Sequence, residues 1–171
     1  MLQQNTVESA LCAIREFFHL INEVTQNMFR KILYPTDFSS GSHQAMNYLT
    51  QLKDAGAEEV VILHVVDTRL LHIPEIYKIV DMSLLGDKQA AAAKKKAGDI
   101  AKELKPAGIK TRIIIAKGIP FQEILRVEQK EDISLTVMGS HGTSNVKDML
   151  LGSVVEKVVR KAKKPVLVIR G

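Results

Sequence analysis

Three glycines and a serine near the C-terminus have the spacing of a phosphate-binding loop. Gly139 and Gly142 are separated by two residues, nine residues follow, and then come Gly152 and Ser153. We expect the first two glycines to allow a turn with positive φ and a close approach of the backbone to a ligand. The later pair is expected to open a helix, whose N-terminus presents free N–H groups and the positive end of a dipole. The pattern therefore predicts a cradle for phosphate groups.

Polar residues follow two other apolar runs in the chain. Thr36 and Asp37 come after the run that ends at Pro35, and Asp67 follows the run 59–66. A carboxylate opposite a phosphate cradle can meet a metal ion or the polar edge of a base. Asp37 can also be interpreted as a turn or helix-capping residue. His64, inside the second run, is interpreted as a core histidine with satisfied hydrogen bonds.

The elements that must position these residues alternate between strands and helices. Helices are expected over 40–55, 87–104, 120–130 and from 147 or 152 to 163, and strands over 30–35, 59–66, 110–116, 133–138 and 166–169. Residues 68–85 are less regular and are interpreted as an insertion. Such alternation predicts a five-stranded parallel sheet with helices on both faces, a Rossmann-like α/β fold. Strand order 3-2-1-4-5 would bring Asp37 and the glycine loop to one crevice at the switch point.

Residues 1–27 form a separate pattern. Apolar residues recur there at spacings of three and four, which indicates an amphipathic helix: Leu11, Ile14, Phe17, Phe18, Ile21 and Val24. We expect this helical extension to pack on the domain or on a partner chain, or to be partly disordered. The domain itself is expected to span residues 28–171.

Composition narrows the class of protein. The chain has 171 residues and a net charge of +5, and its single cysteine, Cys12, favours a cytoplasmic location. It contains neither an apolar run long enough for a bilayer nor a secretion signal.

The basic clusters at 94–96 and 160–164 suggest either a nucleic-acid partner or solvated helix faces. Solvated faces are favoured, since aromatic residues are only 5% and tryptophan is absent. Neither a nucleic-acid nor a membrane partner is expected.

Taken together, these motifs resemble those of one known family. The quoted stretches are Lys31-Ile-Leu-Tyr-Pro-Thr-Asp-Phe-Ser39, Leu63-His-Val-Val-Asp67, Gly139-Ser-His-Gly142, Leu150-Leu-Gly-Ser-Val154 and Lys164-Pro-Val-Leu-Val-Ile169. Through them, residues 28–171 resemble a universal stress protein domain of the ATP-binding subgroup. The resemblance covers almost all of the chain after position 27, and the glycine spacing matches that family's nucleotide-binding signature.

The resemblance implies a role for each matching position. Those implied on the nucleoside side are Pro35, Thr36, Asp37, Val65, Val66, Met138, Gly139 and Ser140. Those implied at the phosphates are His141, Gly142, Gly152, Ser153 and Val154. The implied ligand is ATP, ADP or AMP, with Mg²⁺ or Mn²⁺ bridging phosphate oxygens. Many family members have a basic residue where this chain has Thr143, and Lys147 is the nearest cation in that loop.

The function expected on this basis is a nucleotide-dependent stress or signalling module. ATP hydrolysis is expected to be weak or partner-dependent at most, because the chain lacks a Gly-x-x-x-x-Gly-Lys-Ser/Thr loop. One alternative is an adenine-nucleotide-using enzyme of the same α/β class, and another is a structural partner protein with a vestigial pocket. The last strand, Val166–Ile169, should lie at a sheet edge, where the resemblance implies a homodimer.

Overall fold

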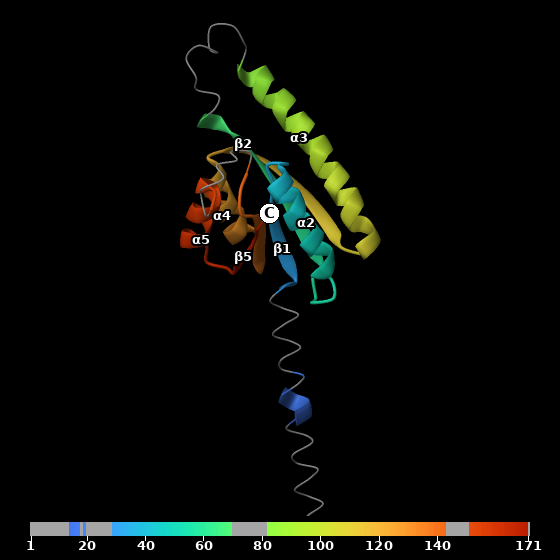
Figure 1. Ribbon diagram of the computed structural model, residues 1–171. Coiled ribbons are helices and arrows are strands. Elements are labelled where there is room, and N and C mark those ends of the chain that lie inside the picture. Colours follow the sequence, from blue (N-terminus) through green and yellow to red (C-terminus); the bar gives the residue numbers. More distant parts are fainter. Residues whose placement is uncertain (1–13, 18, 20–28, 70–81, 143–150, 171) are drawn as a thin grey trace, which may run out of the picture.

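A computed structural model describes residues 14–17, 19, 29–69, 82–142 and 151–170 of the protein. Strands and helices alternate through the domain (Figure 1), with labels as in that figure. Their order is β1 (Lys31–Pro35), α2 (Ser40–Gln51), β2 (Glu59–Asp67), α3 (Met82–Leu104), the 3₁₀ helix η2 (Lys105–Ala107), β3 (Lys110–Gly118), α4 (Pro120–Lys130), β4 (Leu135–Gly139), α5 (Ser153–Lys161) and β5 (Val166–Ile169).

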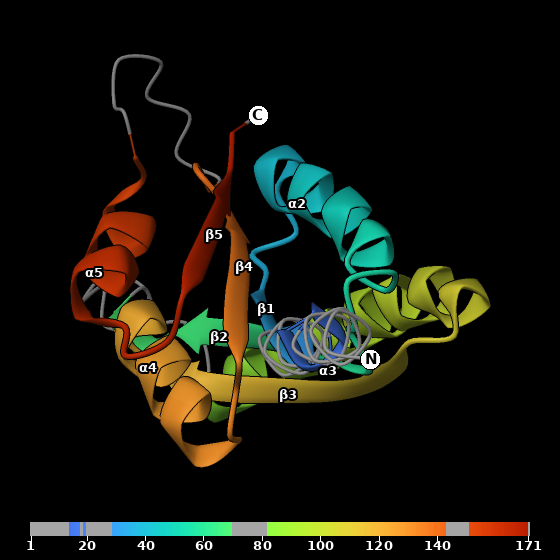
Figure 2. The same ribbon diagram turned by 90° about the horizontal axis from the view of Figure 1, so that it is seen from below.

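The five strands form one parallel sheet in the order β3-β2-β1-β4-β5, so the predicted topology is confirmed. In the centre, Leu33 of β1 pairs with Val61 of β2 on one side and Thr136 of β4 on the other. Figure 2 looks along the sheet and shows helices on both of its faces. The connection from β3 to β4 crosses to the other side of β1, so the switch point lies between β1 and β4, where polar loops follow the strand ends.

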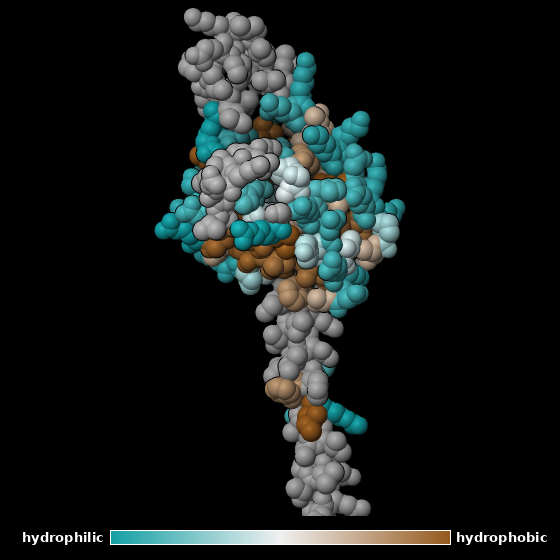
Figure 3. Space-filling view, viewed as in Figure 1, coloured by the Kyte–Doolittle hydropathy of each residue, from teal (hydrophilic) through white to brown (hydrophobic). Residues whose placement is uncertain are grey.

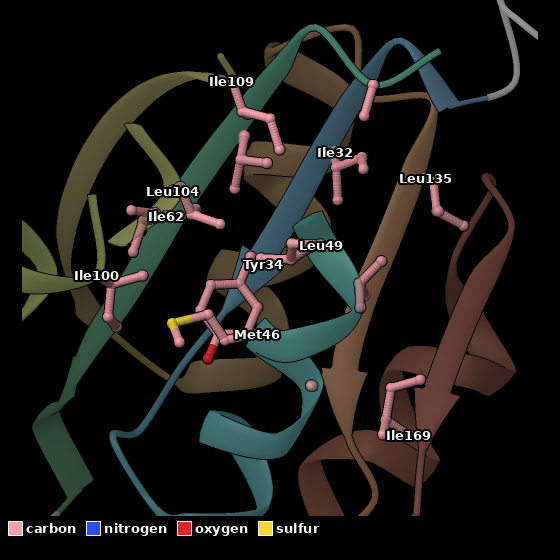
Figure 4. Packing of buried hydrophobic residues seen from close by; sticks show 14 of the residues in the cluster. Ile32, Tyr34, Met46, Leu49, Ile62, Ile100, Leu104, Ile109, Leu135 and Ile169 are labelled. Carbon is pink, nitrogen blue, oxygen red and sulfur yellow. The ribbon is translucent and has the colours of Figure 1, made fainter. Parts of the chain in front are cut away.

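Two hydrophobic cores lie on the two faces of the sheet. Helices α2 and α3 cover the first, where Leu49 and Ile100 pack against Ile32 and Ile62 (Figure 4). Tyr34 belongs to this core, and its hydroxyl donates to the Ser42 carbonyl at 2.6 Å. Burial raises the pKa of the Tyr34 phenol. On the opposite face, α4 and α5 cover the second core.

Most predicted elements are present, with shifted bounds. Helix α3 begins at Met82, five residues before its predicted start, and β3 continues to Gly118. The α2 helix ends at Gln51, and Gly56 then turns the chain with a φ of 102°. The predicted insertion over 68–85 and the predicted helix start near 147 fall largely outside the described residues.

Two surface features bear on possible contacts. Residues 14–17 and 19 are helical, with Ile14 51% and Phe17 61% exposed, whereas the rest of the predicted N-terminal helix lies outside the described residues. On the domain, hydrophobic surface gathers at the position of β5 (Figure 3), where Val166, Leu167 and Val168 are only half-buried. No helix in the described part of the chain is long and apolar enough to cross a membrane.

Candidate functional site

A cavity of about 530 Å³ lies where the carboxyl ends of β1, β2 and β4 meet the start of α5. It is lined by almost every residue that the sequence assigned to a ligand site: Pro35, Thr36, Asp37, Val65, Val66, Met138, Gly139, His141, Gly142, Gly152, Ser153 and Val154. Its wall is therefore apolar at the strand ends and rich in backbone groups at the glycine loop.

Ser140 is the expected site residue that does not line the cavity. Its side chain is buried, and its hydroxyl is hydrogen-bonded to His141 Nδ1 at 2.9 Å. Its N–H donates to the Ile169 carbonyl at 2.7 Å, and its own carbonyl accepts the N–H of Gly152 at 2.8 Å. Ser140 thus ties the end of β4 to β5 and to the start of α5, and so shapes the glycine loop.

The end of β1 is fixed by hydrogen bonds through Thr36. The Thr36 N–H donates to Leu63 O at 2.9 Å, and the Thr36 carbonyl lies 2.8 Å from His64 Nδ1. Its hydroxyl oxygen accepts the Phe38 N–H at 3.0 Å and is hydrogen-bonded to Ser42 Oγ at 3.0 Å. Every polar atom of Thr36 is engaged, which gives the following turn a defined direction.

Asp37 is exposed in the turn that follows. Its Oδ1 accepts the N–H of Ser39 at 3.0 Å, so the interpretation as a turn residue holds in part. Ser39 is the N-cap of α2, since its hydroxyl accepts the Ser42 N–H at 3.3 Å. The second carboxylate oxygen of Asp37 lies next to the backbone of Gly142 and faces the glycine loop.

Gly139 and Gly142 allow neighbouring segments to pack closely against the backbone, and they do not form left-handed turns. Gly139 and Gly142 have no positive φ, so that expectation is wrong for both. A Cβ at Gly139 would lie 2.4 Å from the Gly41 carbonyl oxygen, and one at Gly142 would lie 2.5 Å from Asp37 Oδ2. In contrast, a Cβ at Gly152 would come no nearer than 3.4 Å to its closest neighbour, Ser140 O. Packing against backbone atoms therefore demands glycine at position 139. At position 142 a Cβ would displace the Asp37 carboxylate, and at position 152 it would make only an ordinary contact.

Helix α5 presents its N-terminus to the cavity. Gly152 is its N-cap with φ −65° and ψ 149°, and no side chain among the described residues caps the helix. The first helical hydrogen bond runs from the Glu156 N–H to the Gly152 carbonyl at 2.9 Å. Since no capping side chain among the described residues takes up the N–H groups of the first turn, they can meet a ligand where the helix dipole favours an anion.

Sequence reasoning missed the wall formed by α3. Gln89, Ala92, Ala93 and Lys96 line the cavity there, at spacings of three and four that mark one helix face. The ammonium of Lys96 lies 5.3 Å from the centre of the Phe38 ring. The solvated-face interpretation of 94–96 is thus incomplete, because Lys96, although exposed, also borders the site. The helical spacing of residues 89–96 was the available signal.

Asp67 and Arg69 close the cavity beyond β2. The Arg69 Nη2 atom donates to Asp67 Oδ2 at 2.5 Å, and both its Nε and its backbone N–H donate to Asp67 Oδ1. These hydrogen bonds hold the pKa of the Asp67 carboxyl below its ordinary value. The opposite charges of Asp67 and Arg69 largely cancel, so the pair presents little net charge to a ligand.

Within the described residues, no group of three or more histidine, cysteine, aspartate or glutamate side chains is arranged to hold a metal ion. A divalent cation in this cavity would therefore need oxygen ligands from a bound molecule. Asp37 is the carboxylate placed nearest to the glycine loop. One carboxylate together with ligand phosphates is a usual environment for Mg²⁺.

With this geometry in place, comparison with known proteins decides the family. A sequence profile described as the universal stress protein family matches residues 28–170. The chain belongs to the universal stress protein family. It is 41% identical over 155 residues to universal stress protein MJ0577 of Methanocaldococcus jannaschii, covering 84% of this chain and 96% of the relative. It is 32% identical to universal stress protein YxiE of Bacillus subtilis, covering 84% of this chain and all of that protein.

Solved structures agree with this assignment and with the fold. The structure of MJ0577 superposes with a TM-score of 0.76 at 42% identity, over 84% of this chain and 97% of that one. Universal stress protein UspA from Lactobacillus plantarum gives a TM-score of 0.72 at 28% identity, over 83% of this chain and 98% of that one. This universal stress protein therefore has the α/β fold of its relatives.

Proposed function

We propose that this universal stress protein binds an adenine nucleotide, with ATP as the first candidate, in the cavity at the end of β1. The proposal rests on one observation: an apolar surface and a helix N-terminus line the same cavity. Apolar residues at the strand ends border the same 530 Å³ cavity as the uncapped N-terminus of α5. An apolar pocket with a few convergent polar groups is typical of ligand sites, and a helix N-terminus favours phosphate.

The nucleoside is proposed to lie at the strand ends. Val65, Val66 and Met138 provide apolar surface there for a purine ring, with Pro35 beside them. Thr36 and Asp37 then border the ribose side. The hydroxyl of Thr36 is engaged with the Phe38 N–H and Ser42 and is not offered to a ribose, whereas the Asp37 carboxylate borders the cavity.

The phosphates are proposed to lie at the glycine loop. Gly142 and Gly152 have no side chain to cover their backbone atoms. The next two residues, Ser153 and Val154, carry N–H groups of the first turn of α5. His141 borders the same end of the cavity. A divalent cation, Mg²⁺ or Mn²⁺, fits between the phosphate oxygens and the Asp37 carboxylate, where it would offset the negative charge of the phosphates.

Two more distant proteins of this fold agree with the chemistry. One universal stress protein was solved in complex with cAMP and another, from Arabidopsis thaliana, with AMP bound. At 21% and 15% identity they share the fold alone with this chain. The proposal therefore rests on the residues that line this cavity.

A test of the proposal combines titration with a glycine exchange. Isothermal titration with ATP and Mg²⁺ should give saturable binding, and mass spectrometry of the denatured protein should identify any co-purified nucleotide. Gly152→Val should reduce binding at least tenfold, because the added side chain enters the space of the phosphates. Gly152→Ala tests the same point with less bulk, since its Cβ meets no atom closer than 3.4 Å. Absence of wild-type binding at millimolar ATP would refute the proposal.

We propose that the protein acts in the cytoplasm through its nucleotide-bound state, and not through rapid hydrolysis of ATP. The Asp67 carboxylate is held by Arg69, and Asp37 accepts the Ser39 N–H, so neither is poised as a strong base against a γ-phosphate. We expect steady-state hydrolysis of ATP slower than about one turnover per minute, at the low end for enzymes. A rate of many turnovers per second in a phosphate-release assay would favour the enzyme alternative.

We also propose a homodimer through β5, with residues 28–171 as the folding unit. Support comes from the edge position of β5, its half-buried valines and the apolar surface there in Figure 3. Phe29 packs against the first core, so the folding unit begins at or before that residue. Light scattering on the chain lacking residues 1–27 should still give a dimer that binds ATP. If the full chain is dimeric, a monomeric mass for the shortened chain would assign the dimer contact to the extension instead.

A further inference from the structure

We propose that His64 is a positioning residue of the nucleotide site, and that its imidazole fixes the turn which carries Asp37. This inference rests on the adenine-nucleotide site proposed above. His64 lies near the carboxyl end of β2 and is only half-buried, and its side chain lines the cavity. It is therefore more than a core histidine with satisfied hydrogen bonds.

The first support is the hydrogen bond between His64 and Thr36. His64 Nδ1 lies 2.8 Å from the Thr36 carbonyl oxygen. A carbonyl oxygen can only accept, so Nδ1 carries the proton in this bond. Strand β1 ends at Pro35, which leaves the Thr36 carbonyl beyond the last paired residue of the strand. The imidazole thus takes the place of a strand partner where the chain leaves the sheet.

The second support is the conformation of Phe38, which is unusual for a bulky residue. Phe38 has a φ of 62°, in the left-handed region that non-glycine residues seldom adopt. Its N–H donates to Thr36 Oγ1, and its ring stacks on the His64 ring with centroids 4.6 Å apart and an interplanar angle of 26°. A strained residue persists when its surroundings hold it in place, and such residues gather at ligand sites. His64 therefore holds the turn at both of its ends.

Between these two anchored residues lies Asp37. Its Oδ2 atom would be 2.5 Å from a Cβ at Gly142, so the turn and the glycine loop are in close contact. A loosened turn would move this carboxylate relative to Gly142 and would change the space for ribose and phosphate. His64 acts on the ligand through Thr36 and Phe38, and the geometry assigns it a positioning role.

The experiment compares two exchanges at position 64 by isothermal titration with ATP and Mg²⁺. His64→Phe keeps a ring against Phe38 but removes the donor to Thr36. His64→Asn keeps an N–H donor at a position close to that of Nδ1. We expect His64→Phe to weaken binding about tenfold, the loss that one hydrogen bond commonly causes. His64→Asn should restore at least half of that loss in free energy. His43→Phe, at an exposed position of α2, is the matched control and should bind as the wild type does.

The outcomes separate the two proposals. Wild-type protein that binds no ATP refutes the proposed function, and this inference with it. Wild-type binding with an unchanged affinity in His64→Phe, or with His64→Asn as weak as His64→Phe, overturns the positioning role alone. Phe38→Leu provides a second variant, because it removes the stacked ring and leaves the donor in place. It should weaken binding several-fold, and it decides the matter if His64→Phe does not fold.

Discussion

The backbone of Gly139 at the end of β4 packs directly against the carbonyl of Gly41 in the first turn of α2. A Cβ at position 139 would lie 2.4 Å from that oxygen and 2.9 Å from the Ser42 nitrogen. Both neighbours are backbone atoms, so neither can move without shifting the helix. This contact brings α2 close to the central sheet, and it sets the distance between the β1 turn and the glycine loop.

Gly139→Ala is therefore expected to lower the free energy of unfolding by about 3 kcal/mol, the cost of overpacking at a backbone contact. The matched control is Gly98→Ala in α3, where an added Cβ meets nothing within 4 Å. That exchange should raise the free energy of unfolding by about 0.5–1 kcal/mol, because alanine favours a helix over glycine. Urea unfolding of both variants provides the measurement, and a loss of similar size in each would contradict the packing argument.

Glu128 of α4 is a buried carboxylate that anchors the approach to β5. It is 1% exposed, and its Oε1 accepts the N–H groups of Lys163 at 2.8 Å and Lys164 at 2.9 Å. We expect Glu128→Ala to lower the free energy of unfolding by about 3 kcal/mol, because both N–H groups lose their acceptor. Glu128→Gln keeps an acceptor oxygen at this position and should cost about 1 kcal/mol or less. Equal losses in the two variants by urea unfolding would contradict this account, because they would show that a neutral acceptor oxygen does not replace the carboxylate at this position.

Gly139 was correctly placed at a strand end, because an apolar run before it and a polar loop after it mark that boundary. The expected positive φ was wrong, because a sequence shows the same glycine whether it is needed for a positive φ or for close packing of the backbone. Only the position of Gly41, nearly a hundred residues earlier in the chain, distinguishes the two.

The fold itself followed from local signals. Continuous apolar runs such as 59–66, bounded by glycine, proline or aspartate, identified the buried strands. The order of the strands followed from the polar strand ends and from the family resemblance. The α3 wall was missed because alanine and lysine are common on any exposed helix, and neither type points to a ligand. Its place over β2 and β3 depends on packing that a single helix sequence does not encode.

Lys96 supplies a test of that wall. Its ammonium lies over the Phe38 ring and borders the cavity, and no carboxylate is paired with it among the described residues. We expect Lys96→Met to weaken ATP binding by about threefold to tenfold, since the site loses a cation near an anionic ligand. Lys95→Met removes the same charge at an exposed neighbouring position that does not line the cavity. Titration at constant ionic strength should show a clear difference between the two variants; an equal loss would indicate only a general effect of net charge.

The ion pair of Asp67 and Arg69 predicts a dependence of stability on pH. Hydrogen bonds from Arg69 lower the pKa of Asp67 in the folded state from its ordinary value of 3.8. A carboxyl with a lowered pKa stabilises the fold above its unfolded pKa, and that contribution is lost as the pH falls through the lower folded value. We expect Asp67→Asn to lower Tm by about 2 °C at pH 7, because the pair is partly exposed. This difference should shrink below pH 3.8, and a gap that stays constant from pH 7 to pH 2.5 would exclude the ion pair as its source.

The position of β5 at the edge of the described sheet allows the proposed homodimer to be tested by a backbone change. The carbonyls of Pro165 and Ile169 accept from Thr136 and Ser140 of the β4 segment, so alternate residues of β5 face β4. Because backbone groups alternate along a strand, the N–H of Val168 points away from β4. Val168→Pro removes that outward donor, and an edge strand tolerates proline at such a position. We expect it to raise the dimer dissociation constant at least tenfold while the far-ultraviolet circular dichroism is unchanged. Val168→Thr keeps the N–H and should remain dimeric in light scattering, whereas an intact dimer in Val168→Pro would show that the subunits do not pair along β5.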